Sequence, residues 1–119
     1  MQVVVETPSF EVSAARAGIS PDEISELVTY LAANPDAGRE IKGTGGCRKL
    51  RVAGRGKGKS GGYRAITFFS GPAIPLFLLY AYSKGDRDDL NGKQRNALRM
   101  VTKEIVEAYG QQKLFRRVK

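Results

Sequence analysis

Residues 47–82 read CRKLRVAGRGKGKSGGYRAITFFSGPAIPLFLLYAY and decide the fold of this 119-residue chain. The stretch contains three segments with strand-like apolar patterns, residues 47–52, 63–70 and 74–82. A glycine-rich turn separates the first two segments, and Gly71 with Pro72 separates the last two. Because consecutive strands joined by turns pair as hairpins, the stretch predicts a three-stranded antiparallel sheet.

The chain before this sheet predicts a short strand and two helices. Residues 3–5 are a β-branched run typical of a strand, and residues 10–17 are a short amphipathic segment that ends at a glycine. Residues 20–23 read SPDE, which combines a capping box with proline at the first helical position. A helix is therefore expected to begin there and to end at Asn34 and Pro35. Its expected buried face follows helical spacing and comprises Ile24, Leu27, Val28 and Leu31.

The chain after the sheet predicts one more helix. Asn91 can cap this helix, and residues 113–119 form a basic tail. The expected buried stripe of the helix comprises Ala97, Leu98, Val101, Ile105 and Ala108. Helices on both sides of a hairpin run predict an α+β fold, with a small antiparallel β-sheet, helices from the N-terminal half and a C-terminal helix. We expect a single domain over residues 1–119.

The composition excludes several kinds of protein. The chain has no histidine and one cysteine, which removes an internal disulfide, a Cys-rich metal cluster and both common histidine-dependent catalytic arrangements. Acid–base chemistry would have to come from Lys, Arg, Tyr, Asp or Glu, and we expect neither a metal nor a cofactor. No apolar run approaches the ~20 residues of a membrane span, and the N-terminus lacks the pattern of a secretory signal. We therefore expect a cytoplasmic protein with no membrane partner.

The excess positive charge is concentrated in one stretch. The chain carries 20 basic and 12 acidic residues, a net charge of +8. Residues 42–64 contain eight Lys or Arg, eight Gly and no acidic residue, and the rest of the chain is balanced with twelve of each sign. A concentrated positive patch attracts a polyanion, and phosphate backbones are the commonest polyanions in a cell. The function is expected to reside in this stretch.

Four tempting features have plainer explanations. Residues 53–60 (AGRGKGKS) and 56–61 satisfy loosened phosphate-loop and dinucleotide patterns, but both mechanisms need a helix directly after the loop, and a strand pattern follows. Cys47 has basic neighbours but no histidine partner, so we interpret it as a small strand residue. The carboxylates of residues 86–89 favour the start of the last helix over a metal site.

One constellation of basic residues remains. Lys49 and Arg51 lie two apart on one strand and share a face, provided that Leu50 and Val52 face the core. Antiparallel pairing could bring further side chains onto one surface: Arg64 and Lys84, with Tyr63, Tyr80 and Tyr82 available for stacking or as a phenol. A solvated basic sheet face without chemistry explains the same charges equally well. The residues alone leave both interpretations open.

The segments NPDAG (34–38), GTGGCRKLR (43–51), AGRGKGKSGGYRAITFF (53–69) and YAYSKGDRDDL (80–90) resemble the RelE/ParE superfamily of toxins. Within it, the chain is most similar to the RelE-type, HigB-like branch. The resemblance implies a RelE-like α+β fold. It also implies a toxin of a type II toxin–antitoxin system that acts as a ribosome-dependent mRNA endonuclease and needs no metal.

The resemblance also implies roles for individual residues. In such enzymes the ribose 2′-OH attacks the adjacent scissile phosphate, assisted by Lys and Arg instead of His. Lys49 and Arg51 match the paired basic residues of the second strand of the family, and Arg64 matches an arginine of the third. Lys49 or Arg51 would assist activation of the 2′-OH, and Arg64 would stabilise the charge of the transition state. Lys84 would orient the phosphate.

Some positions depart from the family pattern. A tyrosine near the start of the final helix corresponds to Leu90 here, so Tyr82 and Tyr63 are the candidates for the acid or stacking role. The glycine-rich turn is longer than in the simplest members. Its cations, together with Arg48 and Tyr63, are expected to contact RNA rather than to take part in the chemistry; the three turn cations are Arg55, Lys57 and Lys59.

The expected partners follow from the same resemblance. They are mRNA and ribosomal RNA on the 70S ribosome, and a cognate antitoxin that is acidic, DNA-binding and HigA-like. Two other functions remain as alternatives. One is a ParE-like poison of DNA gyrase, which binds a protein and needs no nuclease site. The other is an RNA-binding module without activity.

Overall fold

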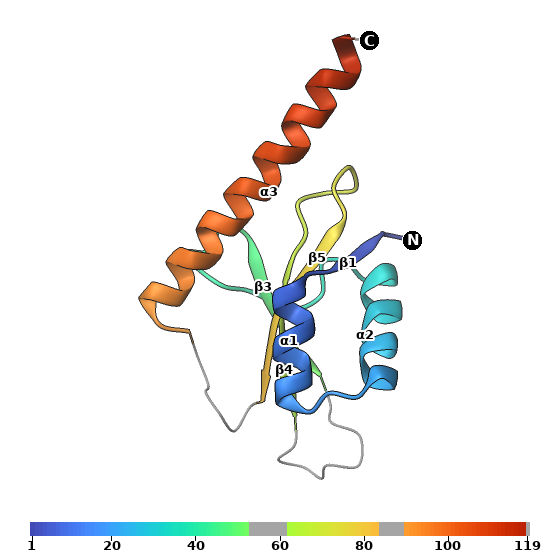
Figure 1. Ribbon diagram of the computed structural model, residues 1–119, viewed down its shortest axis with the longest axis vertical. Helices are drawn as coiled ribbons and strands as arrows, with labels where there is room; N and C mark the ends of the chain where they lie inside the picture. The colour runs from blue at the N-terminus through green and yellow to red at the C-terminus, as the bar shows by residue number, and fades with distance from the viewer. Residues whose placement is uncertain (53–61, 84–89, 119) are drawn as a thin grey trace.

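The described part of the chain contains five strands in one mixed sheet and three helices, which lie on both faces of the sheet (Figure 1). A computed structural model of the chain describes residues 1–52, 62–83 and 90–118, with side chains up to residue 110. The sheet order is β1-β5-β4-β3-β2. In chain order the elements are β1 (Val4–Glu6), α1 (Pro8–Ala17), α2 (Pro21–Ala33), β2 (Arg39–Glu40), β3 (Cys47–Val52), β4 (Tyr63–Phe68), β5 (Leu76–Ser83) and α3 (Gly92–Val118).

The three strands of the central stretch pair as predicted. β3 pairs antiparallel with β4, and β4 pairs antiparallel with β5. The sheet as a whole is mixed rather than antiparallel, because β1 joins the outer edge of β5 in parallel. The chain between β1 and β5 contains two helices and three strands, so the connection is long enough for the two strands to run in parallel. Strand β2 was not predicted from the sequence, because its two residues are too few to show an alternating pattern.

The two N-terminal helices begin and end at the expected signals. In α2 the Glu23 N–H donates to Ser20 Oγ at 3.2 Å, and the Ser20 N–H donates to Glu23 Oε1 at 2.8 Å, which completes the capping box. In α1 the Phe10 N–H donates to the Thr7 side chain at 3.2 Å. Gly18 adopts a left-handed conformation with φ of 85°, which ends α1 and lets the chain turn into α2.

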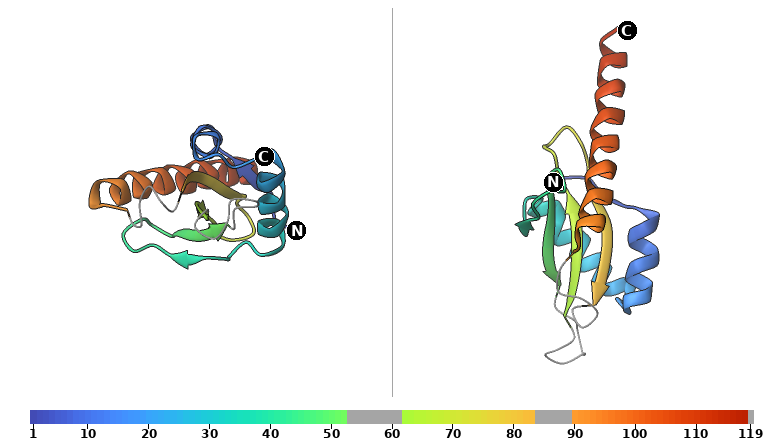
Figure 2. Two further views of the ribbon diagram at one scale, coloured as in Figure 1. Left: turned by 90° about the horizontal axis from the view of Figure 1, so that it is seen from below. Right: turned by 90° about the vertical axis from the view of Figure 1, so that its left-hand side faces the viewer.

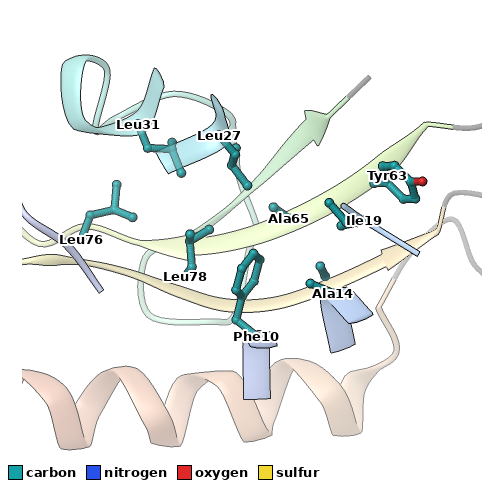
Figure 3. Packing of buried hydrophobic residues seen from close by; sticks show 10 residues of the cluster. Phe10, Ala14, Ile19, Leu27, Leu31, Tyr63, Ala65, Leu76 and Leu78 are labelled. Atoms are coloured by element: carbon teal, nitrogen blue, oxygen red, sulfur yellow. The ribbon is translucent and has the colours of Figure 1, made fainter. Parts of the chain in front are cut away.

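The main hydrophobic core lies between the sheet and the N-terminal helices (Figure 3). Phe10 and Ala14 from α1 and Leu27 and Leu31 from α2 meet strand side chains, which are Tyr63, Ala65, Leu76, Leu78 and Ala81. Leu50 and Val52 of β3 pack against the same cluster. Lys49 and Arg51 therefore face the other side of the sheet, because side chains alternate along a strand.

A second, smaller cluster lies on the opposite face, where α3 passes (Figure 2, right). It comprises Ile41, Cys47, Ile66, Phe68, Leu79, Tyr82 and Leu90, with Leu98 and Ile105 of α3 packed against it. The predicted stripe of α3 is therefore partly wrong. Thr102 is the buried residue in the middle of the helix, whereas Ala97, Val101 and Ala108 are exposed.

Helix α3 is longer than the sequence suggested. The Gln94 N–H donates to Asn91 Oδ1 at 2.8 Å, so Asn91 caps the helix as expected. The helix continues to Val118 and includes most of the segment predicted to be a basic tail. No proline follows Asn91 to stop it. Within the described part of the chain, no helix is long and apolar enough to cross a membrane.

Candidate functional site

The strand pairing places the predicted basic residues side by side on the face that α3 overlooks. Arg51 of β3 lies opposite Arg64 of β4, and Arg64 lies opposite Tyr82 of β5. In the next row, Lys49 lies opposite Ile66 and Ile66 lies opposite Tyr80. Directly opposed residues of an antiparallel pair share a face, so these cations and rings form one surface. We call Lys49, Arg51, Arg64, Tyr80 and Tyr82 the sheet-face site.

The arrangement of Arg51 and Arg64 opposes folding. Like charges directly opposite each other on neighbouring strands are destabilising. In addition, Arg64 Nη1 is buried and has no hydrogen-bond partner among the described residues. A buried donor without a partner costs about 1–3 kcal/mol. An anion between the two guanidinium groups would remove both penalties, because a phosphate oxygen accepts hydrogen bonds and neutralises charge.

The two tyrosines of the site differ in exposure. Tyr80 is 39% exposed and Tyr82 only 5%, and their ring centroids lie 6.3 Å apart with a 36° angle between the planes. Tyr80 can therefore stack on a base, as exposed aromatic rings do in single-strand binding surfaces. Tyr82 packs in the second hydrophobic cluster together with Leu90. Leu90 closes the apolar floor of the site.

Arg39 is a further cation on this face among the described residues. Arg39 of β2 lies directly opposite Lys49 and is exposed. It extends the row of positive charge to the edge of the sheet. Sequence reasoning missed Arg39 because β2 was not recognised, and only the pairing of β2 with β3 reveals its position.

Tyr63 and Arg48, two predicted RNA-contacting residues, lie off the face of the sheet-face site, and for the buried Tyr63 this corrects the sequence interpretation. Tyr63 is 3% exposed in the core on the α1/α2 side, and its hydroxyl donates to the Gly18 carbonyl at 3.2 Å. It opposes Val52 and Ser83, so it alternates away from the sheet-face site. Arg48 also alternates away from Lys49, and its Nη1 donates to the Gly38 carbonyl at 3.0 Å. Neither residue belongs to the site.

Other predicted positions fall outside the described residues. These are Arg55, Lys57 and Lys59 of the glycine-rich turn, Lys84, and the carboxylates of residues 86–89. At the end of the glycine-rich turn the described chain resumes at Gly62 and enters β4 at Tyr63. A strand therefore follows the turn, as expected, and the helix that a phosphate loop needs is not there.

Cys47 is a core residue. Its side chain is fully buried beneath α3, and burial raises the pKa of its thiol from 9.0 to about 11, although a hydrogen bond with Thr44 acts in the opposite direction. A thiol of this kind is protonated at neutral pH and is not a nucleophile. The interpretation of Cys47 as a small strand residue is confirmed. Among the described residues, no group of three or more His, Cys, Asp or Glu could hold a metal ion.

An open apolar groove of about 360 Å³ adjoins the site. Ile66, Leu79 and Tyr80 form its floor, and Ala97, Leu98 and Val101 of α3 form one wall. The exposure of Val101, which the predicted stripe placed in the core, follows from this groove. Helix α3 covers only part of this face of the sheet, and the groove beside the helix stays open.

The fold and the site together define a small α+β protein that presents cations and a tyrosine on one face of a mixed sheet. The chain belongs to the RelE toxin family, because a family model described as the RelE toxin of the RelE / RelB toxin–antitoxin system matches residues 4–118. A double arginine-to-alanine mutant of the E. coli toxin RelE, solved in the free state, has a similar structure, with a TM-score of 0.53. The match covers 73% of this chain and 87% of that chain, at 11% sequence identity.

These comparisons confirm the predicted RelE-type family and the α+β RelE-like fold. At 11% identity the structural likeness bears on the fold alone. The narrower assignment to a HigB-like branch stays a prediction.

Proposed function

We propose that this RelE-family toxin inhibits translation by cutting mRNA on the ribosome, without a metal ion. The observation that supports this most is the opposed pair of Arg51 and Arg64, with the buried and unpartnered Nη1 of Arg64. Two guanidinium groups held against their own repulsion suit a phosphate that gains negative charge during a reaction. A solvated sheet face would not need a buried guanidinium nitrogen.

The proposed reaction is an intramolecular transfer at phosphorus. The 2′-oxygen attacks the adjacent phosphate and forms a new O–P bond, while the bond from phosphorus to the 5′-oxygen breaks. The 2′-OH proton leaves to a base, a proton reaches the departing 5′-oxygen, and a 2′,3′-cyclic phosphate remains. Lys49 or Arg51 assists removal of the first proton, and Arg64 stabilises the charge that develops on the phosphate.

The two tyrosines of the sheet-face site and Lys84 complete the proposed mechanism. Tyr80 stacks on a base beside the scissile phosphate, since it is the exposed ring of the pair. Tyr82 lies beside Tyr80, with ring centroids 6.3 Å apart, and is the candidate for the proton donor to the 5′-oxygen. Lys84 follows β5 directly in the sequence and is proposed to orient the phosphate.

The proposed partners are translating ribosomes in the cytoplasm and a cognate antitoxin. The family description names a RelE / RelB pair, and a toxin of this kind needs neutralisation until it acts. An acidic antitoxin would complement the net charge of +8. A HigA-like, DNA-binding character of that antitoxin is part of the proposal.

The proposal is tested by mapping message ends by primer extension after brief induction, and by incubating purified toxin with mRNA in the presence and absence of translating ribosomes. We expect cuts within translated regions that need ribosomes and that Arg64→Gln strongly reduces. Intact mRNA together with DNA damage signalling would instead indicate a gyrase poison. RNA binding without cleavage under both conditions would indicate a non-catalytic module.

A further inference from the structure

The first three turns of α3 carry positive charge that helix stability does not explain. Residues 92–103 contain four basic residues and no acidic one, and the first turn has no acidic residue. Cations near a helix N-terminus oppose the helix dipole, and like charges four residues apart repel each other. Arg95, Arg99 and Lys103 have that four-residue spacing, so they follow one side of the helix.

A hydrogen bond joins α3 to the turn between β2 and β3 beside these cations. Thr102 is 3% exposed, and its hydroxyl donates to the carbonyl of the buried Thr44 at 3.0 Å. The stem of Arg99 covers the same turn, since a Cβ added to Gly45 would lie 3.7 Å from Arg99 Cγ. A Cβ added to Gly43 would lie 4.0 Å from Arg95 Cδ. The stems of both arginines therefore run beside the turn.

The turn connects these cations to the sheet-face site. It leads directly into β3, which carries Lys49 and Arg51, and it follows β2, which carries Arg39 on the same face. Lys42 is exposed at the start of the turn. Positive charge thus continues from the site, along the edge of the sheet, onto one side of α3.

We infer that Lys42, Arg99 and Lys103, with Arg95 beside them, form a second contact surface for an RNA phosphate backbone, which we call the α3 basic side. The inference rests on the proposed function, because the RNA is taken to be the ribosomal RNA around the cleavage site. A regular row of cations about 6 Å apart along a helix matches a backbone of repeating charge. The contacts position the toxin and take no part in the chemistry.

RNA fits this surface better than an acidic protein does. Protein interfaces need an apolar centre around which polar contacts are arranged. On α3 the apolar groove lies on the other side of the helix, along Ala97, Leu98 and Val101. The α3 basic side offers guanidinium and ammonium groups, with Arg99 Nη2 held by Asn96 Oδ1 at 3.0 Å.

The test compares two double variants that remove equal charge from exposed side chains. Arg99→Gln/Lys103→Gln changes the α3 basic side, whereas Arg16→Gln/Lys93→Gln changes α1 and the start of α3. Binding to purified 70S ribosomes programmed with mRNA is measured from low to high KCl. We expect the first variant to reduce the slope of log affinity against log salt by about 1.5, and the second to keep the wild-type slope. Arg99→Lys/Lys103→Arg, which retains both charges, should also keep the wild-type slope.

The outcomes separate this inference from the proposed function. Wild-type slope and affinity in Arg99→Gln/Lys103→Gln, with mRNA cleavage intact, would overturn the inference and leave the function standing. If ribosome binding depended on these residues but the wild type cut no mRNA, the proposed function would be wrong and this inference would stand. If the variant weakened binding of poly-L-glutamate but not of ribosomes, the surface would be a site for an acidic protein and the inference would be wrong.

Discussion

Arg51 and Arg64 lie directly opposite each other on β3 and β4, so that two guanidinium groups share one face of the sheet. Neighbouring strands run only about 5 Å apart, and the pair therefore costs folding free energy. Lys49 and Arg39 continue the charge in the adjacent row. Outside residues 42–64 the positive and negative charges of the chain balance, whereas these strands place like charges next to each other. That cost is understandable if the site must hold an anion.

Replacement of Arg64 should separate activity from stability. We expect Arg64→Gln to lower the rate of ribosome-dependent mRNA cleavage by ~100- to 1,000-fold, because it removes a donor aimed at the developing charge. The free energy of unfolding should not fall, since the change relieves repulsion and removes a buried nitrogen that lacks a partner among the described residues. Single-turnover cleavage and urea unfolding measure the two effects. Loss of stability with full activity would show that Arg64 is a structural residue.

Two tyrosines of the neighbouring strands should behave oppositely. Tyr80→Ala should weaken binding of mRNA-programmed ribosomes by about 10-fold, because stacking on a base contributes about 1–3 kcal/mol, while stability changes little. Tyr63→Phe should leave cleavage unchanged and lower the free energy of unfolding by about 1 kcal/mol, since it removes the bond to the Gly18 carbonyl. Equal losses of cleavage in both variants would contradict the assignment of the two rings to opposite faces.

The fold could be predicted to the extent that local signals specify it. Ser20 and Glu23 place the start of α2, Asn91 places that of α3, and alternation in β3 puts Lys49 and Arg51 on one face. These features depend on residues near one another in the chain, so the sequence contains them directly.

The rest depends on pairing over longer distances. The register between β4 and β5 shifts between Ile66 and Thr67, so Leu79 and Tyr80 of β5 both face the site side. Strict alternation from Leu78, which lies in the main core, would have put Tyr80 and Tyr82 on the wrong face. A bulge of this kind has no local signature in the sequence. The face that α3 buries was equally undetermined, because it depends on how the helix leans over the sheet.

The buried thiol should make stability depend on alkaline pH. Burial raises the pKa of Cys47 to about 11, above the value of 9.0 for an unperturbed thiol. Because the folded pKa is the higher one, the stabilising contribution is complete below pH 9 and is lost as the pH rises toward 11. Wild type should therefore lose on the order of 2 kcal/mol of unfolding free energy over this range relative to Cys47→Ala. Urea unfolding at several pH values measures it. Parallel curves for the two proteins would contradict the burial of the thiol.

The attachment of α3 to the sheet can be tested at Gly45. Gly45 has φ of +78°, and a Cβ there would lie 2.6 Å from Thr102 Oγ1, the atom that anchors the helix. Gly45→Ala should therefore lower the free energy of unfolding by about 1–3 kcal/mol, through backbone strain and displacement of Thr102. Gly110→Ala is the matched control, because Gly110 is helical with nothing within 4 Å of an added Cβ, and it should raise stability by about 0.5–1 kcal/mol. If Gly45→Ala were neutral while Gly110→Ala stabilised, the hydrogen bond from Thr102 to the turn would not be what holds α3. If α3 is held there, Gly45→Ala should also reduce the salt dependence of ribosome binding, because it displaces the α3 basic side from the turn.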